Sequence, residues 1–222
     1  MTSTARNPPR FKKMIPMQRP VFQEQLHERR RHFEELQRLQ PIKFSEPRQA
    51  YPGVSLVSLD RQYHFLDPTV AGELAPVFDF PGVTESQIVL HIKWPGYSYI
   101  QYRTIDLREG GVPITRRKLA EKVATGLIDY TLQEATSHAG WRDAPHQWRL
   151  AIDLLDEHQG LFISYKNLRL TGLTYCHDNI FIPDVYCVTD AEGTPVENEV
   201  PELPIAYSQL DVENLTLVYA TF

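Results

Sequence analysis

The sequence has no run of apolar residues close to the ~20 that a helix needs to cross a bilayer. Its 222 residues include only two cysteines, Cys176 and Cys187, so it has no disulfide framework of the kind that stabilises small secreted domains. It also does not open with a charged segment followed by an apolar one, as a secretory leader would. These absences predict a soluble intracellular protein without a membrane span, located in the cytoplasm or the nucleus.

The short motifs that carry chemistry are missing as well. There is no glycine loop that cradles a phosphate, no Gly-x-Ser-x-Gly, no His-Glu-x-x-His and no Cys-x-x-Cys. The eight histidines are scattered without the spacing of metal ligands. We therefore expect no metal, no cofactor and a function that does not depend on catalysis.

Two weaker candidates for catalysis are present. Cys176, His177 and Asp178 are consecutive, but neighbours on a strand point to opposite faces, whereas the members of a triad converge from separated positions. This stretch is more typical of a turn capped by Asp178. His91 lies on the polar face of a predicted strand, and a general base there would need Asp106, the only acid on the same face of the next strand.

The strongest structural pattern begins at Gln87. Residues 87–94 alternate between polar and apolar, which predicts a half-buried strand with one face formed by Ile88, Leu90, Ile92 and Trp94. A turn with type II chemistry follows at residues 94–97, which read Trp-Pro-Gly-Tyr. If a hairpin closes there, Trp94 faces Tyr97 and Ile92 faces Tyr99 as core pairs rather than as a stacking platform for a ligand. Type II is not the favoured turn of a short hairpin, so a wider connection is the alternative.

An amphipathic helix is predicted over residues 115–134. Thr115 has the chemistry of an N-cap, and Ile114 and Leu119 have the spacing of a hydrophobic staple. One face is apolar and contains Leu119, Ala120, Val123, Leu127 and Tyr130. The first turn carries Arg116, Arg117 and Lys118, which oppose the helix dipole. They form either an anion-binding site or, as is more common, a solvated charged face.

A second strand pair is predicted at residues 168–175 and 180–188. The polar segment between them, 176–179, has turn chemistry. Pro183 cannot donate a ladder hydrogen bond, which predicts that the second strand lies at an edge or contains a bulge. Further strands are predicted at 54–59, 148–154 and 210–222, with a helix as the alternative for the second of these.

These elements predict an α+β fold with two layers, an antiparallel sheet that carries one main amphipathic helix. The core has the order β-β-α-β-β and spans residues 87–188. A chain of this length buries roughly 70% of the surface that its unfolded form exposes, which is sufficient for one sizeable core. We therefore expect a single α+β domain over residues 41–222.

The charge is divided between the two ends of the chain. Residues 1–50 carry 11 Lys or Arg against 5 Asp or Glu, whereas residues 51–222 carry 12 against 23. Residues 1–20 are predicted to be a disordered basic arm, since four prolines break any helix there and argue against a mitochondrial transit peptide. Residues 21–40 are predicted to be an amphipathic helix, interrupted by Arg29, Arg30 and Arg31. This arginine cluster is either a solvated helix face or a site for a polyanion or an import receptor.

Three short motifs together resemble a known group of sequences. They are the Trp-Pro-Gly-Tyr turn at 94–97, the Pro-Ile-Thr-Arg helix entry at 113–116 with Leu119-Ala120 and Val123-Ala124, and the strand pair within 163–187. Over residues 87–188 the chain resembles uncharacterised proteins abundant in mushroom-forming, basidiomycete fungi. The resemblance implies a fungal source and a β-β-α-β-β core, and it brings no activity with it.

Three functions fit these observations. The first is a non-catalytic interaction module, in which the acidic domain binds a protein partner or another copy of itself and the helix at 21–40 docks or tethers. The second is an enzyme of unrecognised type that uses a His/Asp pair. The third is a nucleic-acid or polyanion binder that works through Arg29, Arg30, Arg31, Arg116, Arg117 and Lys118. An acidic body repels a phosphate backbone unless its cations form one continuous patch, so we expect the first.

Overall fold

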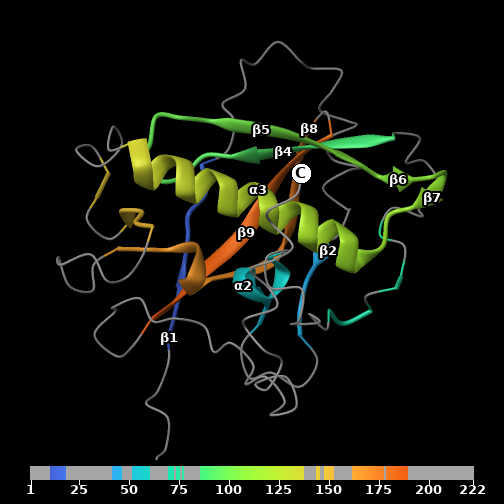
Figure 1. Ribbon diagram of the computed structural model, residues 1–222, viewed down its shortest axis with the longest axis horizontal. Helices are drawn as coiled ribbons and strands as arrows, with labels where there is room; N and C mark the ends of the chain where they lie inside the picture. Colours follow the sequence, from blue (N-terminus) through green and yellow to red (C-terminus); the bar gives the residue numbers. More distant parts are fainter. Residues whose placement is uncertain are drawn as a thin grey trace, which may run out of the picture.

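The computed structural model describes residues 11–18, 42–46, 52–60, 70–72, 74, 75, 77, 86–137, 144, 145, 148–152, 162–177 and 179–189. The strands are β1 (Phe11–Met14), β2 (Ile42–Lys43), β3 (Val54–Ser55), β4 (Gln87–Ile92), β5 (Gln101–Asp106), β6 (Arg108–Glu109), β7 (Val112–Pro113), β8 (Leu168–His177) and β9 (Ile180–Thr189). The helices are α2 (Leu56–Leu59), α3 (Arg116–Ser137) and the 3₁₀ turn η3 (Tyr165–Asn167). This confirms the α+β class, with one main helix, α3, on a mostly antiparallel sheet (Figure 1).

The sheet is built from two hairpins that meet side by side. β4 pairs with β5, and β8 pairs with β9, each time antiparallel. The hairpins join where β4 runs parallel to the start of β9, with Val89 opposite Ile180 and Leu90 opposite Phe181. The short strands β2 and β3 pair with the outer side of β8. The order is therefore β2-β8-β9-β4-β5, which leaves β5 at one margin.

β9 is the central strand, which corrects the prediction that Pro183 marks an edge or a bulge. The two shifts in register fall in β8, and β9 has neighbours on both sides. Val185 accepts a hydrogen bond from Ile15, so Pro183, two residues earlier, also directs its backbone toward that side. The neighbour on that side changes there from β4, which pairs with residues 180 and 181, to β1, which pairs with residues 186–189. The proline thus lies where the ladder requires no donor.

β1 is an unexpected part of the sheet. Phe11 pairs with Thr189 and Met14 with Tyr186, antiparallel to β9, and Ile15 is buried in the core. The Gln18 N–H then donates to the carbonyl of Lys93, the residue that follows β4. The predicted disordered arm at residues 1–20 is therefore wrong for residues 11–18. The helix predicted at 21–40 and the strand predicted at 210–222 lie outside the described residues.

The turn after β4 is confirmed. The Tyr97 N–H donates to the Trp94 carbonyl at 3.1 Å, and Gly96 has the positive φ, +84°, that a type II turn requires. Gly96 also passes close to the backbone of Ala144, where a Cβ atom would lie 2.6 Å from its Cα. Both conditions exclude other residues at this position.

The pairing predicted across this turn is wrong. Ile92 pairs with Gln101 rather than with Tyr99, so residues 93–100 form a connection wider than the turn itself. Trp94 and Tyr97 do not form a cross-strand pair. Both side chains instead form hydrogen bonds with the backbone of residues 148–150. The Trp94 Nε1–H donates to the Trp148 carbonyl, and the Tyr97 hydroxyl accepts from the Leu150 N–H.

Helix α3 forms as its sequence predicts and runs on to Ser137. The Lys118 N–H donates to the Thr115 hydroxyl, which confirms the N-cap, and the predicted apolar face is fully buried. At Gly126 a Cβ atom would lie 3.2 Å from side-chain atoms of both Leu90 and Arg103. The missing side chain therefore lets α3 lie directly against β4 and β5.

Two other predicted strands are shorter than expected. Only Val54 and Ser55 pair with β8, and α2 follows directly. Of the described residues 148–152, only Leu150 forms a bridge, parallel to Ile163, and Ile152 is exposed although the alternation placed it inside. Both segments are apolar enough for a strand, but of their described residues only Val54, Ser55 and Leu150 have another strand or segment to pair with.

A buried ion pair anchors the region around β3. The Arg169 guanidinium on β8 lies 2.9 Å from the Glu46 carboxylate and also donates to the Gly53 carbonyl at 2.8 Å. The other Glu46 oxygen accepts from the Ser55 N–H. The charges are thereby hydrogen-bonded on several sides, which is the condition for burying them without a large penalty.

Candidate functional site

The predicted pair of His91 and Asp106 does not form. The two residues share a face of the sheet, but Asp106 pairs with Gln87, which is four residues along β4 from His91 and therefore about 13 Å away at strand spacing. His91 is fully buried, not on an open polar face; its Nε2 lies 3.2 Å from the Gln18 carbonyl and its ring meets Tyr102 edge-on. Gln18 belongs to the segment 1–20, which was predicted to be disordered. The geometry gives His91 a packing role.

The stretch at 176–178 ends a strand. Cys176 and Cys187 are both buried and are not joined in a disulfide, and Asn179 has a φ of +63°, as a residue in a tight turn does. Asp178 lies outside the described residues. Among the residues that the structure describes, no group of three or more His, Cys, Asp or Glu side chains is placed to hold a metal ion.

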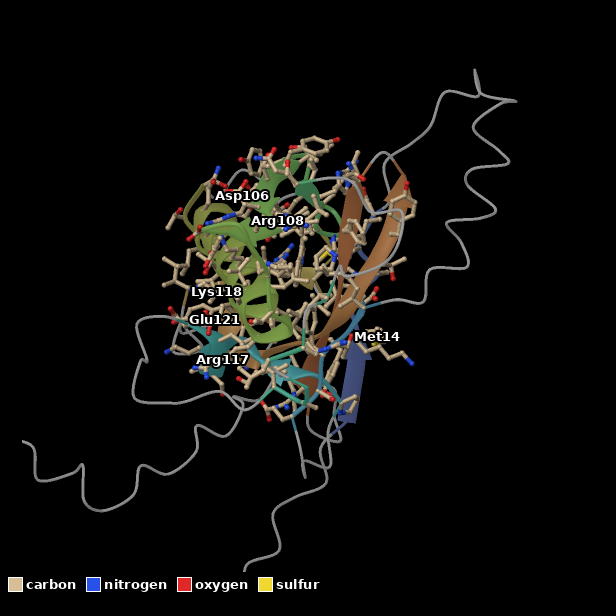
Figure 2. All side chains as sticks on the ribbon, turned by 90° about the vertical axis from the view of Figure 1, so that its right-hand side faces the viewer. Met14, Asp106, Arg108, Arg117, Lys118 and Glu121 are labelled. Atoms are coloured by element: carbon tan, nitrogen blue, oxygen red, sulfur yellow. The ribbon has the colours of Figure 1, made fainter. Side chains whose placement is uncertain are left out.

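The three cations in the first turn of α3 all have partners within the protein. The Arg116 guanidinium donates to the Lys43 carbonyl at 2.6 Å. Arg117 and Lys118 lie on either side of Glu121, at 3.1 and 3.6 Å from its carboxylate (Figure 2). This is the arrangement of a solvated helix face that balances its own charge, and binding of an anion by these residues stays a prediction. Arg29, Arg30 and Arg31 lie outside the described residues.

Trp94, Tyr97 and Tyr130 form part of the core, as predicted, whereas Tyr99 does not. The Tyr130 hydroxyl accepts from the Trp94 N–H at 3.3 Å and donates to the Tyr99 carbonyl at 3.1 Å. Together with the bonds of Trp94 and Tyr97 to residues 148–150, these contacts join three separate segments. Burial raises the pKa of both the Tyr97 and the Tyr130 hydroxyl, so each stays protonated and serves as a structural hydrogen-bonding group.

The surface most suited to binding is the outer edge of β5. The Leu107 N–H donates to the Ser86 carbonyl, so the odd-numbered residues of this strand direct their backbone groups toward β4. Tyr102, Thr104 and Asp106 must then direct theirs outward. In the described part of the chain, no strand pairs with this side of β5. β5 is six residues of regular strand, without proline or bulge, and lies at the margin of the sheet formed by the described residues (Figure 1).

The side chains along this edge do not protect it. Proteins usually blunt a free edge with charged side chains, prolines or bulges. Here Arg103 lies 2.6 Å from Asp129 of α3, and Asp106 accepts from Gln87 at 2.7 Å, so both charges are held by groups of the same domain. Tyr102 is 56% exposed on the sheet face that carries His91, and Tyr99 is 38% exposed beside α3. A tyrosine therefore flanks the edge on each face of the sheet.

Comparison with protein-family models, with curated proteins and with solved structures finds no match. The function must therefore be argued from the geometry, and the resemblance to fungal proteins stays a prediction. None of the helices in the described ranges is long and apolar enough to cross a membrane.

The sequence contained a signal for this edge. The six residues of β5 read Gln-Tyr-Arg-Thr-Ile-Asp, and Ile105 is the only one that is buried. A strand with a single inward apolar residue is typical of a sheet margin, whereas β4 is apolar at every second position. The register that directs Tyr102 and Thr104 outward depends on the pairing with β4, which the sequence did not predict.

Proposed function

We propose that the protein is a non-catalytic protein-interaction module that binds an extended segment of a partner protein as an additional strand along β5. The observation that carries this proposal is the regular free edge, with outward backbone groups at Tyr102, Thr104 and Asp106. Strand addition of this kind draws its affinity from main-chain hydrogen bonds and its specificity from alternate side chains.

The edge supplies enough interactions for moderate affinity. Three outward residues offer three N–H donors and three carbonyl acceptors, and each bond made contributes about 0.5–1.5 kcal/mol net. Tyr99 and Tyr102 add amphipathic surface of the type enriched at protein interfaces. The excess of acidic residues in 51–222 favours a partner segment that is neutral or basic. Cys176 and Cys187 are not joined in a disulfide, which favours the cytoplasm or the nucleus, where thiols stay reduced.

The test is a substitution that removes one outward N–H and nothing else from the ladder. Thr104→Pro deletes the donor on the free side of β5 while leaving the bonds of Arg103 and Ile105 to β4 in place. Peptides of twelve residues selected from a displayed random library on the wild-type protein provide the probe, and calorimetry measures their binding. We expect Thr104→Pro to weaken binding at least about tenfold, which corresponds to 1.4 kcal/mol.

Thr104→Val is the matched control, because it keeps the N–H and a β-branched side chain. It should bind the peptides as the wild type does. Equal binding by the proline variant at unchanged melting temperature would contradict the proposal. If light scattering instead shows a wild-type dimer that Thr104→Pro converts to a monomer, the edge is occupied by a second copy and the proposed partner segment is wrong.

A further inference from the structure

The sheet margin formed by β5 continues beyond the end of that strand. The chain bends at Leu107, and β6 then extends the line of β5 into the β6–β7 hairpin (Figure 1). The Leu107 N–H donates to the Ser86 carbonyl, and the Leu107 carbonyl accepts from the Ile114 N–H, each at 2.8 Å. Leu107 is thus bonded both to the residue before β4 and to the residue after β7. Both strands therefore lie on the inner side of the run 101–109.

Arg108 directs its backbone groups to the outer side of this run. It is opposite Pro113, which has no N–H to donate, whereas Glu109 and Val112 are the pair that closes the hairpin. The two glycines between them both have positive φ, as a type I′ turn requires. Hydrogen-bonded and non-hydrogen-bonded pairs alternate along an antiparallel ladder. Arg108 therefore continues the outward series of the even-numbered residues of β5.

The Arg108 side chain lies on the same face of the sheet as Asp106. Exposed side chains alternate with buried ones along residues 104–108, and the bend does not interrupt this alternation. The next side chain, Glu109, points to the opposite face, where its carboxylate lies 2.8 Å from the Lys122 ammonium of α3. This ion pair ties the hairpin to α3 and leaves Arg108 on the face away from the helix.

The Arg108 guanidinium has no carboxylate partner among the described residues. Arg103 and Lys118 lie 2.6 and 3.6 Å from carboxylates of α3, whereas the exposed Arg108 donates to the Gly111 carbonyl of its own hairpin at 3.2 Å. A guanidinium presents five N–H donors in a planar fork that matches a carboxylate, which it binds through two parallel hydrogen bonds. The outer edge of the run 101–109 thus ends in a group suited to an acid.

We propose that the partner strand carries one carboxylate beside Arg108. This inference rests on the function proposed for β5 and names the chemistry of the partner. In antiparallel pairing, the more stable kind per residue, the partner residue opposite Arg108 lies on the same face, with its side chain in reach of the guanidinium. The partner residue two positions later lies beside Asp106, whose charge disfavours a second acid. The recognised segment therefore has a single acidic residue at its N-terminal end rather than an acidic run.

Calorimetry with a charge-swapped pair of peptides tests this inference. The twelve-residue peptides selected on the wild-type protein should share an acidic residue near the N-terminus, and a selected set without one would overturn the inference. One such peptide is compared with the same peptide carrying Lys at that position. We expect the wild type to bind the acidic peptide about fivefold more tightly, as an exposed ion pair allows, with a preference that falls as NaCl is added.

Variants at Arg108 assign the preference to this side chain. Arg108→Glu should reverse it, so that the lysine peptide binds more tightly, and Arg108→Gln should remove it. Lys43→Glu makes an equal change of charge at an exposed residue of β2, on the opposite margin of the sheet, and should retain the wild-type preference.

Thr104→Pro separates a failure of this inference from a failure of strand addition. If Thr104→Pro weakens the binding of both peptides while Arg108→Glu keeps the wild-type preference, the carboxylate beside Arg108 is wrong and strand addition along β5 stands. If Thr104→Pro leaves the binding of both peptides unchanged, strand addition and the carboxylate are both overturned.

Discussion

Tyr130 shows how much of this fold depends on single polar atoms. Its hydroxyl accepts one hydrogen bond and donates another, to two residues of the 93–100 connection, and its ring stacks on that of Tyr99 at 5.7 Å. The side chain is fully buried, and its bond with the Trp94 N–H is buried as well. A buried donor that loses its partner costs more than the hydrogen bond contributed.

The variant Tyr130→Phe removes only this oxygen. It leaves the Trp94 N–H and the Tyr99 carbonyl without their partner, and we expect the free energy of unfolding to fall by about 1–3 kcal/mol. Urea denaturation followed by tryptophan fluorescence measures the change. Tyr102→Phe serves as the control, since that hydroxyl is in water and its loss should have little effect on stability. Equal stability of the two variants would show that the hydroxyl of Tyr130 is not a structural bond.

The sequence predicted which side chains enter this core but not what their polar atoms meet. Trp94, Tyr97 and Tyr130 were placed inside by the period of a strand, a turn and a helix. The partners of Trp94 and Tyr97 lie more than fifty residues further along, at Trp148 and Leu150, in a segment where Leu150 forms a single bridge among the described residues.

At the level of elements, β1 is the clearest departure from expectation. It has four residues, two of them lysines, and prolines precede and follow it. No local pattern predicts a strand there, because the strand exists only through its ladder with Tyr186–Thr189 of β9. Local signals in the sequence, such as the N-cap and apolar face of α3, were sufficient to predict the helix. Whether a short segment forms a strand depends instead on the strands that pair with it.

Deleting residues 1–18 should therefore destabilise the domain. The deletion exposes the backbone of β9 from Val185 to Thr189, removes Ile15 from the core and takes the Gln18 carbonyl from His91. Loss of the buried isoleucine alone costs about 1.5–3 kcal/mol. We expect a lower melting temperature by calorimetry than for a deletion of residues 1–9, which retains the strand. Identical melting temperatures for the two proteins would show that β1 does not contribute to the folded state.

At the scale of the whole molecule, the architecture follows from two hairpins and one helix. The fold class and the β-β-α-β-β order were predicted, because each hairpin and α3 have local patterns that agree with the global arrangement. The side-by-side order of the hairpins was not predicted, since the parallel contact of β4 with β9 joins residues some ninety positions apart. That contact makes β9 central and leaves β5 at the margin.

The free margin at β5 is the central claim, and amide exchange in the unbound protein tests it most directly. The amides of Arg103 and Ile105 face β4 and should be strongly protected, whereas those of Tyr102 and Thr104 face outward and should exchange close to the rate of an unstructured peptide. The outward amides should become protected when a selected peptide is added. Strong protection of Tyr102 and Thr104 in the unbound monomer would contradict the account, because it would mean that another part of the chain already covers this edge.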